Sequence, residues 1–176
     1  MKSRYKAFEE GAICFVTSSI VDWIPVFKSD KYYEILIEAL SHRQKSGQMK
    51  LYAYVLMDNH FHLILSVEKI SKFMKEFKSF TARGIIDLLK ENREIDKLEQ
   101  LKAKKKSHKK DSEYQVWQEG FHPQQITSEE MYTQKIEYIH QNPVRSGLVD
   151  NPEDWKYSSA SNYSTGEGLL KIDPLT

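Results

Sequence analysis

The distribution of apolar residues predicts three β-strands in the first half of the chain. Residues 12–20, 50–57 and 60–67 are rich in β-branched, aromatic and aliphatic side chains, which is typical of strands. Only Asp58 and Asn59 separate the second run from the third, so we expect a tight hairpin there. Successive strand residues face opposite sides, and one face of the third run is predicted to join the core: Phe61, Leu63, Leu65 and Val67.

Helical spacing predicts two helices around these strands. Ser29 and Asp30 precede an apolar pattern over residues 31–40, where Ser29 offers a capping hydroxyl. A longer pattern covers residues 70–92. Its predicted buried stripe consists of Phe73, Phe77, Phe80 and Gly84.

A further helix is predicted over residues 128–141. Thr127 is followed three residues later by Glu130, which is the arrangement of a capping box. Pro143 disfavours a helical conformation at Asn142, so we expect the helix to end near that residue. The predicted buried stripe of this helix consists of Tyr132, Ile136 and Ile139.

A short apolar run at residues 114–118 predicts a fourth strand. The resulting order of strand, helix, strand, strand, helix, strand and helix predicts an α+β fold with an antiparallel sheet. The ferredoxin-like sandwich is the expected arrangement of such elements. Residues 1–150 are predicted to form one domain, and residues 151–176 are predicted to be a C-terminal tail packed on it.

Composition narrows the class of protein. Of the 176 residues, 40% are hydrophobic and 29% are charged, which is ordinary for a globular protein. The formal net charge is only +1, so any binding of nucleic acid must depend on local positive charge. Cys14 is the single cysteine, which excludes an internal disulfide and fits a reducing compartment.

The sequence also predicts a cytoplasmic protein without a membrane partner. The basic N-terminus, with Lys2, Arg4 and Lys6, is interrupted by Glu9 and Glu10, unlike a secretory signal. No run approaches the roughly 20 apolar residues that a membrane-spanning helix requires.

Two basic segments are candidates for local positive charge. Residues 101–110 carry lysines without any acid, which predicts a mobile loop after a long helix. The predicted helix at residues 70–92 carries further cations beside its phenylalanines. Both segments are either solvated surface or contact sites for phosphates. The candidate DNA-binding residues are Lys72, Lys75, Lys78, Arg83, Lys104, Lys105 and Lys106.

The chain contains two patterns with chemical potential. His60 and His62 are two apart in a predicted strand, so their imidazoles face the same side and could bind a divalent metal or only fill space. Tyr138 and Asn142 are four apart in a predicted helix, so they lie one above the other. A phenol and an amide oxygen in this arrangement suit a nucleophile beside a metal ligand.

Together these residues resemble the HUH single-tyrosine transposases, most closely the REP-associated tyrosine transposase (RAYT) branch. The resemblance extends over roughly residues 5–165. Its specific segments are residues 55–65, 138–149 and 152–160, and Trp117-Gln118 with Gly120-Phe121 is a looser match.

The resemblance implies an enzyme that cuts and joins single-stranded DNA with hairpin ends. Tyr138 would be the nucleophile that forms a 5′-phosphotyrosine, on a C-terminal helix of a transposase domain over residues 1–150. His60, His62 and Asn142 would bind the metal, Mg²⁺ or Mn²⁺. Related enzymes often have glutamine in place of Asn142, and they act either as monomers or as homodimers.

Two departures from the family pattern leave alternatives open. Asp58 stands where relatives usually have proline, and Pro123-Gln124 stand where many relatives have an acid followed by histidine, with His122 one position away. A domesticated protein that binds hairpin DNA without cleaving it is therefore the second hypothesis. A metal-dependent hydrolase of small substrates is the third, although no second carboxylate-rich cluster lies near His60.

Overall fold

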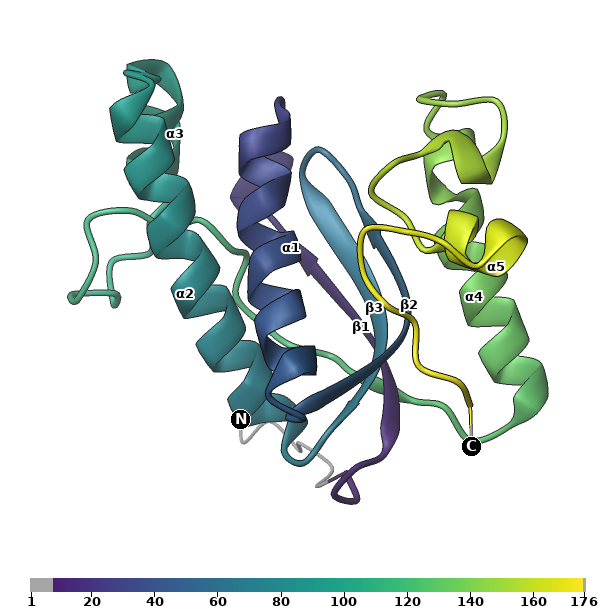
Figure 1. Cartoon of the computed structure of the whole chain (residues 1–176). Helices are drawn as coiled ribbons and strands as arrows, with labels where there is room; N and C mark the ends of the chain where they lie inside the picture. The colour runs from purple at the N-terminus through teal and green to yellow at the C-terminus, as the bar shows by residue number, and fades with distance from the viewer. Residues whose placement is uncertain (1–7, 176) are drawn as a thin grey trace.

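The computed structural model describes residues 8–175. The basic N-terminal residues Lys2, Arg4 and Lys6, which were compared with a secretory signal, lie outside this range. Its centre is a four-stranded antiparallel sheet in the order β2-β3-β1-β4 (Figure 1). The strands are β1 (Ile13–Ser19), β2 (Met49–Leu56), β3 (His60–Val67) and β4 (Gln124–Gln125). This order confirms the predicted ferredoxin-like α+β fold.

Helices cover both faces of the sheet (Figure 1). The structure contains α1 (Asp30–Lys45), α2 (Ile70–Glu91), α3 (Ile95–Ala103), α4 (Glu129–Arg145) and α5 (Ala160–Thr165), with short 3₁₀ turns η1 (Val21–Trp23) and η2 (Pro152–Asp154). α1 and α2 pack on one face, over the predicted stripe of β3 that begins with Phe61. α4 packs on the other face, where Ile139 lies against Phe15 and Ile64. Because both faces are covered, β2 and β3 are buried along almost their whole length.

The predicted strand at residues 114–118 is wrong. Within it, only Trp117 forms a bridge, with Ile20, and the edge strand is instead Gln124–Gln125, paired with β1. Val116 and Trp117 are apolar because they pack in the core between the sheet and α2, not because they extend the sheet. A two-residue strand of glutamines has no apolar alternation that a sequence pattern could reveal.

Two predicted helix details also need correction. Phe80 is 60% exposed, because the buried line along α2 passes from Phe77 to Thr81 rather than through Phe80. α4 continues past Pro143 to Arg145. Pro143 has no N–H to donate to the Ile139 carbonyl, so the helix loses one internal hydrogen bond there. Leu148 N–H donates to the Pro143 carbonyl at 3.0 Å and closes the helix end.

The lysine-rich segment differs from its predicted loop at its start. α3 was not predicted, and residues 101–103 belong to it. Leu101 is fully buried, which fixes the beginning of the segment against the core.

The C-terminal residues lie along the outer edge of β2. Tyr157 O accepts a hydrogen bond from Leu56 N at 2.8 Å, and Ser159 N donates to Tyr54 O at 2.9 Å. The Trp155 indole donates to Leu56 O at 2.9 Å. These contacts are those expected of a tail packed on the same domain, while the boundary at residue 150 stays a prediction. Within residues 8–175, no helix has the length and apolar character to cross a bilayer.

Candidate active site

The two histidines of β3 lie on the face covered by α4. His60 begins the strand and His62 follows on the same side, and their ring centroids are 5.0 Å apart. His62 is 5% exposed, whereas His60 is half-buried. The neighbouring β1 residue Phe15 stacks on the His62 ring at 5.5 Å between centroids, so the imidazole is held between strand and helix.

One ring nitrogen of each histidine is already engaged. Nδ1 of His62 lies 2.7 Å from the hydroxyl of Thr17, its partner across the β1–β3 pair. Nδ1 of His60 lies 2.7 Å from Oδ1 of Asn59, and the amide nitrogen of Asn59 donates to Trp23 O at 3.0 Å. These contacts fix the orientation of both rings. Because Nδ1 is engaged in each, Nε2 is the nitrogen through which each imidazole could bind a metal.

Helix α4 brings the tyrosine and the asparagine to these histidines. The Tyr138 ring is 5.2 Å from the His62 ring, edge to face, and 44% of the residue is exposed. One turn later, Asn142 is buried and lines the same pocket as His60 and His62. The structure therefore brings together all four residues singled out by sequence, on two elements that are far apart along the chain.

Further residues of this pocket were missed by the sequence analysis. An open pocket of about 620 Å³ is lined by Phe15, Thr17, Trp23, His60, His62, Gln124, Lys135, Tyr138 and Asn142. Lys135 had a usable signal, because it precedes Tyr138 by three residues and so shares its helix face. Thr17 and Trp23 had none, since their places opposite the histidines depend on strand register and on an irregular connection. Arg145 lies over the outer face of the Tyr138 ring, 4.7 Å from its centroid.

Comparison with known proteins assigns the chain to a family. The sequence pattern of the family described as "Transposase IS200 like" matches residues 24–142, which include both histidines, Tyr138 and Asn142. The chain belongs to the IS200-like transposase family. The DNA transposase predicted from sequence is therefore confirmed as the class of enzyme.

Two relatives agree with the predicted branch of this family. The transposase is 24% identical to a Haemophilus influenzae protein described as a candidate REP-associated tyrosine transposase, over 160 residues that cover 90% of this chain and 85% of the relative. A solved structure described as a REP-associated tyrosine transposase bound to a REP hairpin matches with a TM-score of 0.68 at 18% identity. That match covers 100% of this chain and 94% of the other, and it supports the fold.

Electrostatics keep the two imidazoles of the transposase neutral. Burial lowers the pKa of His62 to about 3, with smaller contributions from the positive charges of Arg145 and Lys135 and from the charge that His60 would carry if it were protonated. Burial also lowers the pKa of His60, although the carboxylate of Asp58 and the nearby Asn142 side chain act in the opposite direction. A neutral imidazole is the form that binds a metal.

The donor set fits a divalent ion. Among the described residues, no group of three histidines, cysteines or acids could form a site. A third protein ligand beside the two histidines would therefore be an amide oxygen, and both Asn142 and Gln124 line the pocket. Asp58 also shapes the β2–β3 turn, because its backbone carbonyl accepts hydrogen bonds from Val26 N at 3.0 Å and Phe27 N at 2.9 Å.

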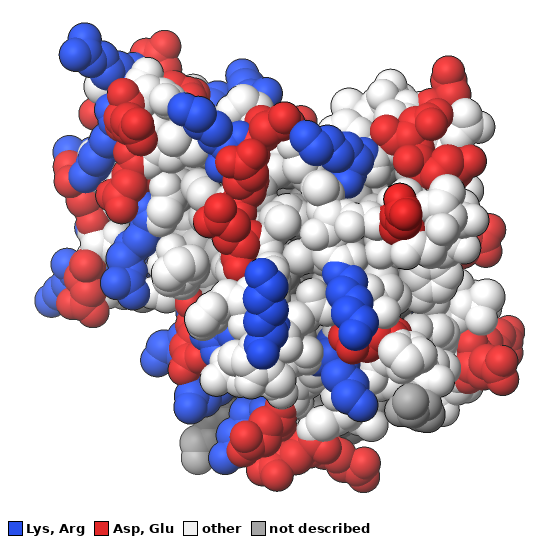
Figure 2. Space-filling model, in the orientation of Figure 1, with Lys and Arg blue, Asp and Glu red and all other residues white. Residues whose placement is uncertain are grey.

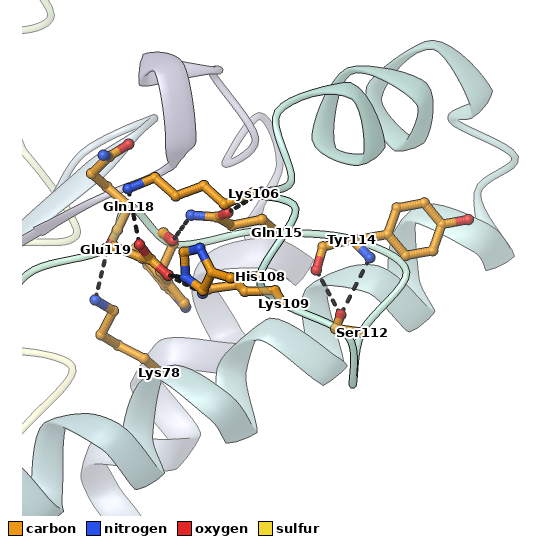
Figure 3. Close-up of polar contacts among 10 residues, drawn as sticks. Lys78, Lys106, His108, Lys109, Ser112, Tyr114, Gln115, Gln118 and Glu119 are labelled. Atoms are coloured by element: carbon orange, nitrogen blue, oxygen red, sulfur yellow. Dashed lines mark hydrogen bonds and ion pairs between the residues drawn. The ribbon is translucent and has the colours of Figure 1, made fainter.

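The seven predicted DNA-binding cations do not line this pocket. A separate groove of about 710 Å³ lies between α2 and residues 109–121 and includes Lys75, Lys78 and Arg83. The Lys78 ammonium donates to Gln118 O at 2.9 Å in this groove (Figure 3). Burial lowers the pKa of Lys78, and the nearby Lys109 adds to the effect.

Acids outside the lysine-rich segment pair with it. Glu119 binds Lys106 at 2.9 Å, His108 at 2.8 Å and Lys109 at 3.5 Å (Figure 3). Lys104 lies 2.9 Å from Asp22. The positive charge that stands out in the sequence is thus partly neutralised by the fold, and Figure 2 shows basic and acidic side chains interspersed over the α2 and α3 side.

Proposed function

We propose that this transposase cuts and rejoins single-stranded DNA beside a hairpin, with Tyr138 as the nucleophile. The observation that carries the proposal is the 5.2 Å approach of the Tyr138 ring to the buried His62 ring, across the β3–α4 contact. The REP-named relatives, one of them bound to a REP hairpin, support a substrate that bears a hairpin. Action on DNA and the single cysteine favour the cytoplasmic location expected from the sequence.

In the proposed reaction, the Tyr138 hydroxyl oxygen attacks the phosphorus of one phosphodiester. A bond forms between the phenolic oxygen and phosphorus, the bond from phosphorus to the 3′ oxygen breaks, and that oxygen takes up a proton to become a 3′-hydroxyl. The phenolic proton passes to solvent, which reaches the partly exposed Tyr138. The resulting 5′-phosphotyrosine retains the diester energy, so a 3′-hydroxyl can reverse the step without a nucleotide cofactor.

We further propose that His60, His62 and Asn142 hold Mg²⁺ or Mn²⁺. When bound, such an ion polarises a phosphate and offsets its charge. The support for this set is chemical: both imidazoles are neutral, both have Nδ1 engaged, and Asn142 lines the same pocket.

Two cations of α4 complete the proposed site. The Lys135 ammonium lies 4.5 Å from the centroid of the Phe15 ring and lines the pocket, and we assign it to the scissile phosphate. Arg145 donates to the backbone carbonyl of Tyr138 at 2.8 Å while its guanidinium covers the phenol ring, and we propose that it orients the nucleophile. All of these residues come together within one chain, and we therefore propose that the protein acts as a monomer rather than as a homodimer.

A covalent-adduct assay tests the proposal. Labelled single strands with a hairpin are incubated with the protein and Mn²⁺, and the products are separated under denaturing conditions. The protein should form a stable adduct, and Tyr138→Phe should abolish it while binding to DNA is retained. Tyr132→Phe is the matched control, because this tyrosine lies on the same helix and contacts Tyr163 instead of the histidines. The claim is falsified if Tyr138→Phe still forms the adduct, and binding without any adduct would identify a non-cleaving hairpin-binding protein.

A further inference from the structure

An exposed tryptophan stands at the rim of the candidate active site. Trp23 lines the same pocket as Tyr138, and 59% of the residue is exposed. Its indole meets the His60 ring edge to face, with 5.6 Å between centroids. Neither the reaction proposed above nor the metal site requires an aromatic side chain at this place.

The backbone that presents Trp23 is strained. Asp22 has a φ of 54° and Trp23 a φ of 55°, and both values lie in the left-handed region that L-residues other than glycine disfavour. The surrounding fold maintains this conformation: Val21 N donates to Val116 O at 2.8 Å, and Ile24 is buried. Asp22 also binds Lys104 at 2.9 Å. Such a conformation persists only where the surrounding structure enforces it, and residues of this kind cluster at functional sites.

The tryptophan and the metal-site histidine are fixed by one amide. The Asn59 side chain donates to the Trp23 carbonyl at 3.0 Å, and its oxygen lies 2.7 Å from Nδ1 of His60. The backbone that carries the indole is therefore fixed relative to the histidine, and the indole itself meets the His60 ring edge to face.

We propose that the Trp23 indole is a stacking platform for one unpaired nucleobase beside the scissile phosphate. The inference rests on the proposed function, because it takes single-stranded DNA as the substrate. A strand without a partner exposes the flat faces of its bases, and proteins bind such strands by combining cations for phosphates with aromatic rings for bases. The pocket offers both, with Lys135 on α4 and Trp23 in η1.

Abasic substitution in the DNA provides the test. A series of hairpin oligonucleotides is made in which each member lacks the base at one unpaired position near the cleavage site. Each member is titrated, with Mn²⁺ present, against the Tyr138→Phe protein, which binds DNA but should not cleave it. The same series is titrated against Tyr138→Phe combined with Trp23→Gly. Glycine accepts a φ of 55°, so this change removes the indole and relieves the backbone strain.

With Trp23 present, loss of one particular base should weaken binding by roughly 5- to 150-fold, the range for base–aromatic stacking. Trp23→Gly should weaken binding of the intact oligonucleotide by a similar factor. The affinity of this variant should no longer depend on whether that base is present. Trp23→Phe should restore much of the difference. Phe80→Ala, which removes a similarly exposed ring far from the pocket, should leave binding unchanged.

Two results would overturn the inference. The first is that Trp23→Gly binds the intact oligonucleotide as tightly as the protein that keeps Trp23. The second is that removal of the base weakens binding equally with and without the indole. Adduct formation by the unmodified protein is scored separately. Base-specific loss of binding without adducts would refute the cleavage proposal alone, whereas adducts without any Trp23-dependent base effect would refute stacking alone.

Discussion

Replacing Thr17 by valine should weaken metal binding without changing any proposed ligand. Thr17 lies opposite His62 in the β1–β3 pair, and its hydroxyl is 2.7 Å from Nδ1 of that ring. If Nε2 of His62 binds the ion, Nδ1 carries the proton and donates to Thr17. Valine has the same branched shape and suits a strand, so Thr17→Val removes the acceptor and little else.

The size of the effect follows from the burial of His62. The ring is 5% exposed, so water has little access to replace the lost acceptor. A buried donor left unpaired costs about 1–3 kcal/mol, and removal of such a hydrogen-bond partner of a metal ligand typically lowers affinity by about 10- to 100-fold. We expect a loss of Mn²⁺ affinity in that range.

Calorimetric titration with Mn²⁺ measures this loss directly. Adduct formation should fall at low Mn²⁺ and recover when Mn²⁺ is raised in proportion, because the nucleophile is untouched. Thr133→Val is the control, since Thr133 lies on the exposed side of α4 and its hydroxyl bonds only to the backbone carbonyl of Glu129. Unchanged Mn²⁺ affinity in Thr17→Val would refute the idea that Thr17 orients His62 for a metal.

Three other outcomes are expected. Lysine-to-glutamine changes at residues 104–106 should leave metal affinity unchanged and should reduce the salt slope of log DNA affinity by about 2, at roughly 0.7 per phosphate contact; an unchanged slope would mark these lysines as surface that never meets DNA. Lys106 and His108 hold the pKa of Glu119 at about 2, below its ordinary 4.5, so this carboxylate stabilises the fold above pH 4.5 and loses that contribution as the pH falls toward 2. Denaturant unfolding of Glu119→Gln should therefore differ from the parent at pH 6 and converge with it near pH 2, and a constant difference would contradict the assignment. Thr81→Val removes the acceptor of the buried Trp117 indole N–H and should lower the free energy of unfolding by about 1–3 kcal/mol, whereas equal urea midpoints would mean that the indole finds another partner.

The elements that sequence predicted correctly are those with a local signal. The β2–β3 hairpin has two apolar runs and a polar turn. The start of α4 has a capping hydroxyl, but the cap is Ser128, whose Oγ accepts from Met131 N at 3.1 Å, and not Thr127 of the predicted capping box. The shared face of His60 and His62 follows from strand geometry alone. The same reasoning placed Tyr138 and Asn142 on one helix face.

What sequence could not predict depends on contacts between distant segments. Spacing along the chain contains no distance between Tyr138 and His62, so their association came only from the family resemblance. The acids that neutralise the lysine-rich segment, Asp22 and Glu119, lie outside it. Trp23 lies in an irregular connection with a left-handed backbone, and the sequence has no glycine there that would predict this conformation.

The placement of the nucleophile on α4 also has a consequence for inheritance. α4 covers an apolar face of the sheet, where Ile139 closes over Phe15, Val55 and Ile64. A nonsense mutation before residue 129 would remove Tyr138 and would leave this face open to water, so the shortened chain should aggregate or be degraded. Point substitution at Tyr138 keeps the cover in place. A lineage that gave up cutting while it kept hairpin binding would therefore be expected to retain α4 at full length, with its tyrosine replaced.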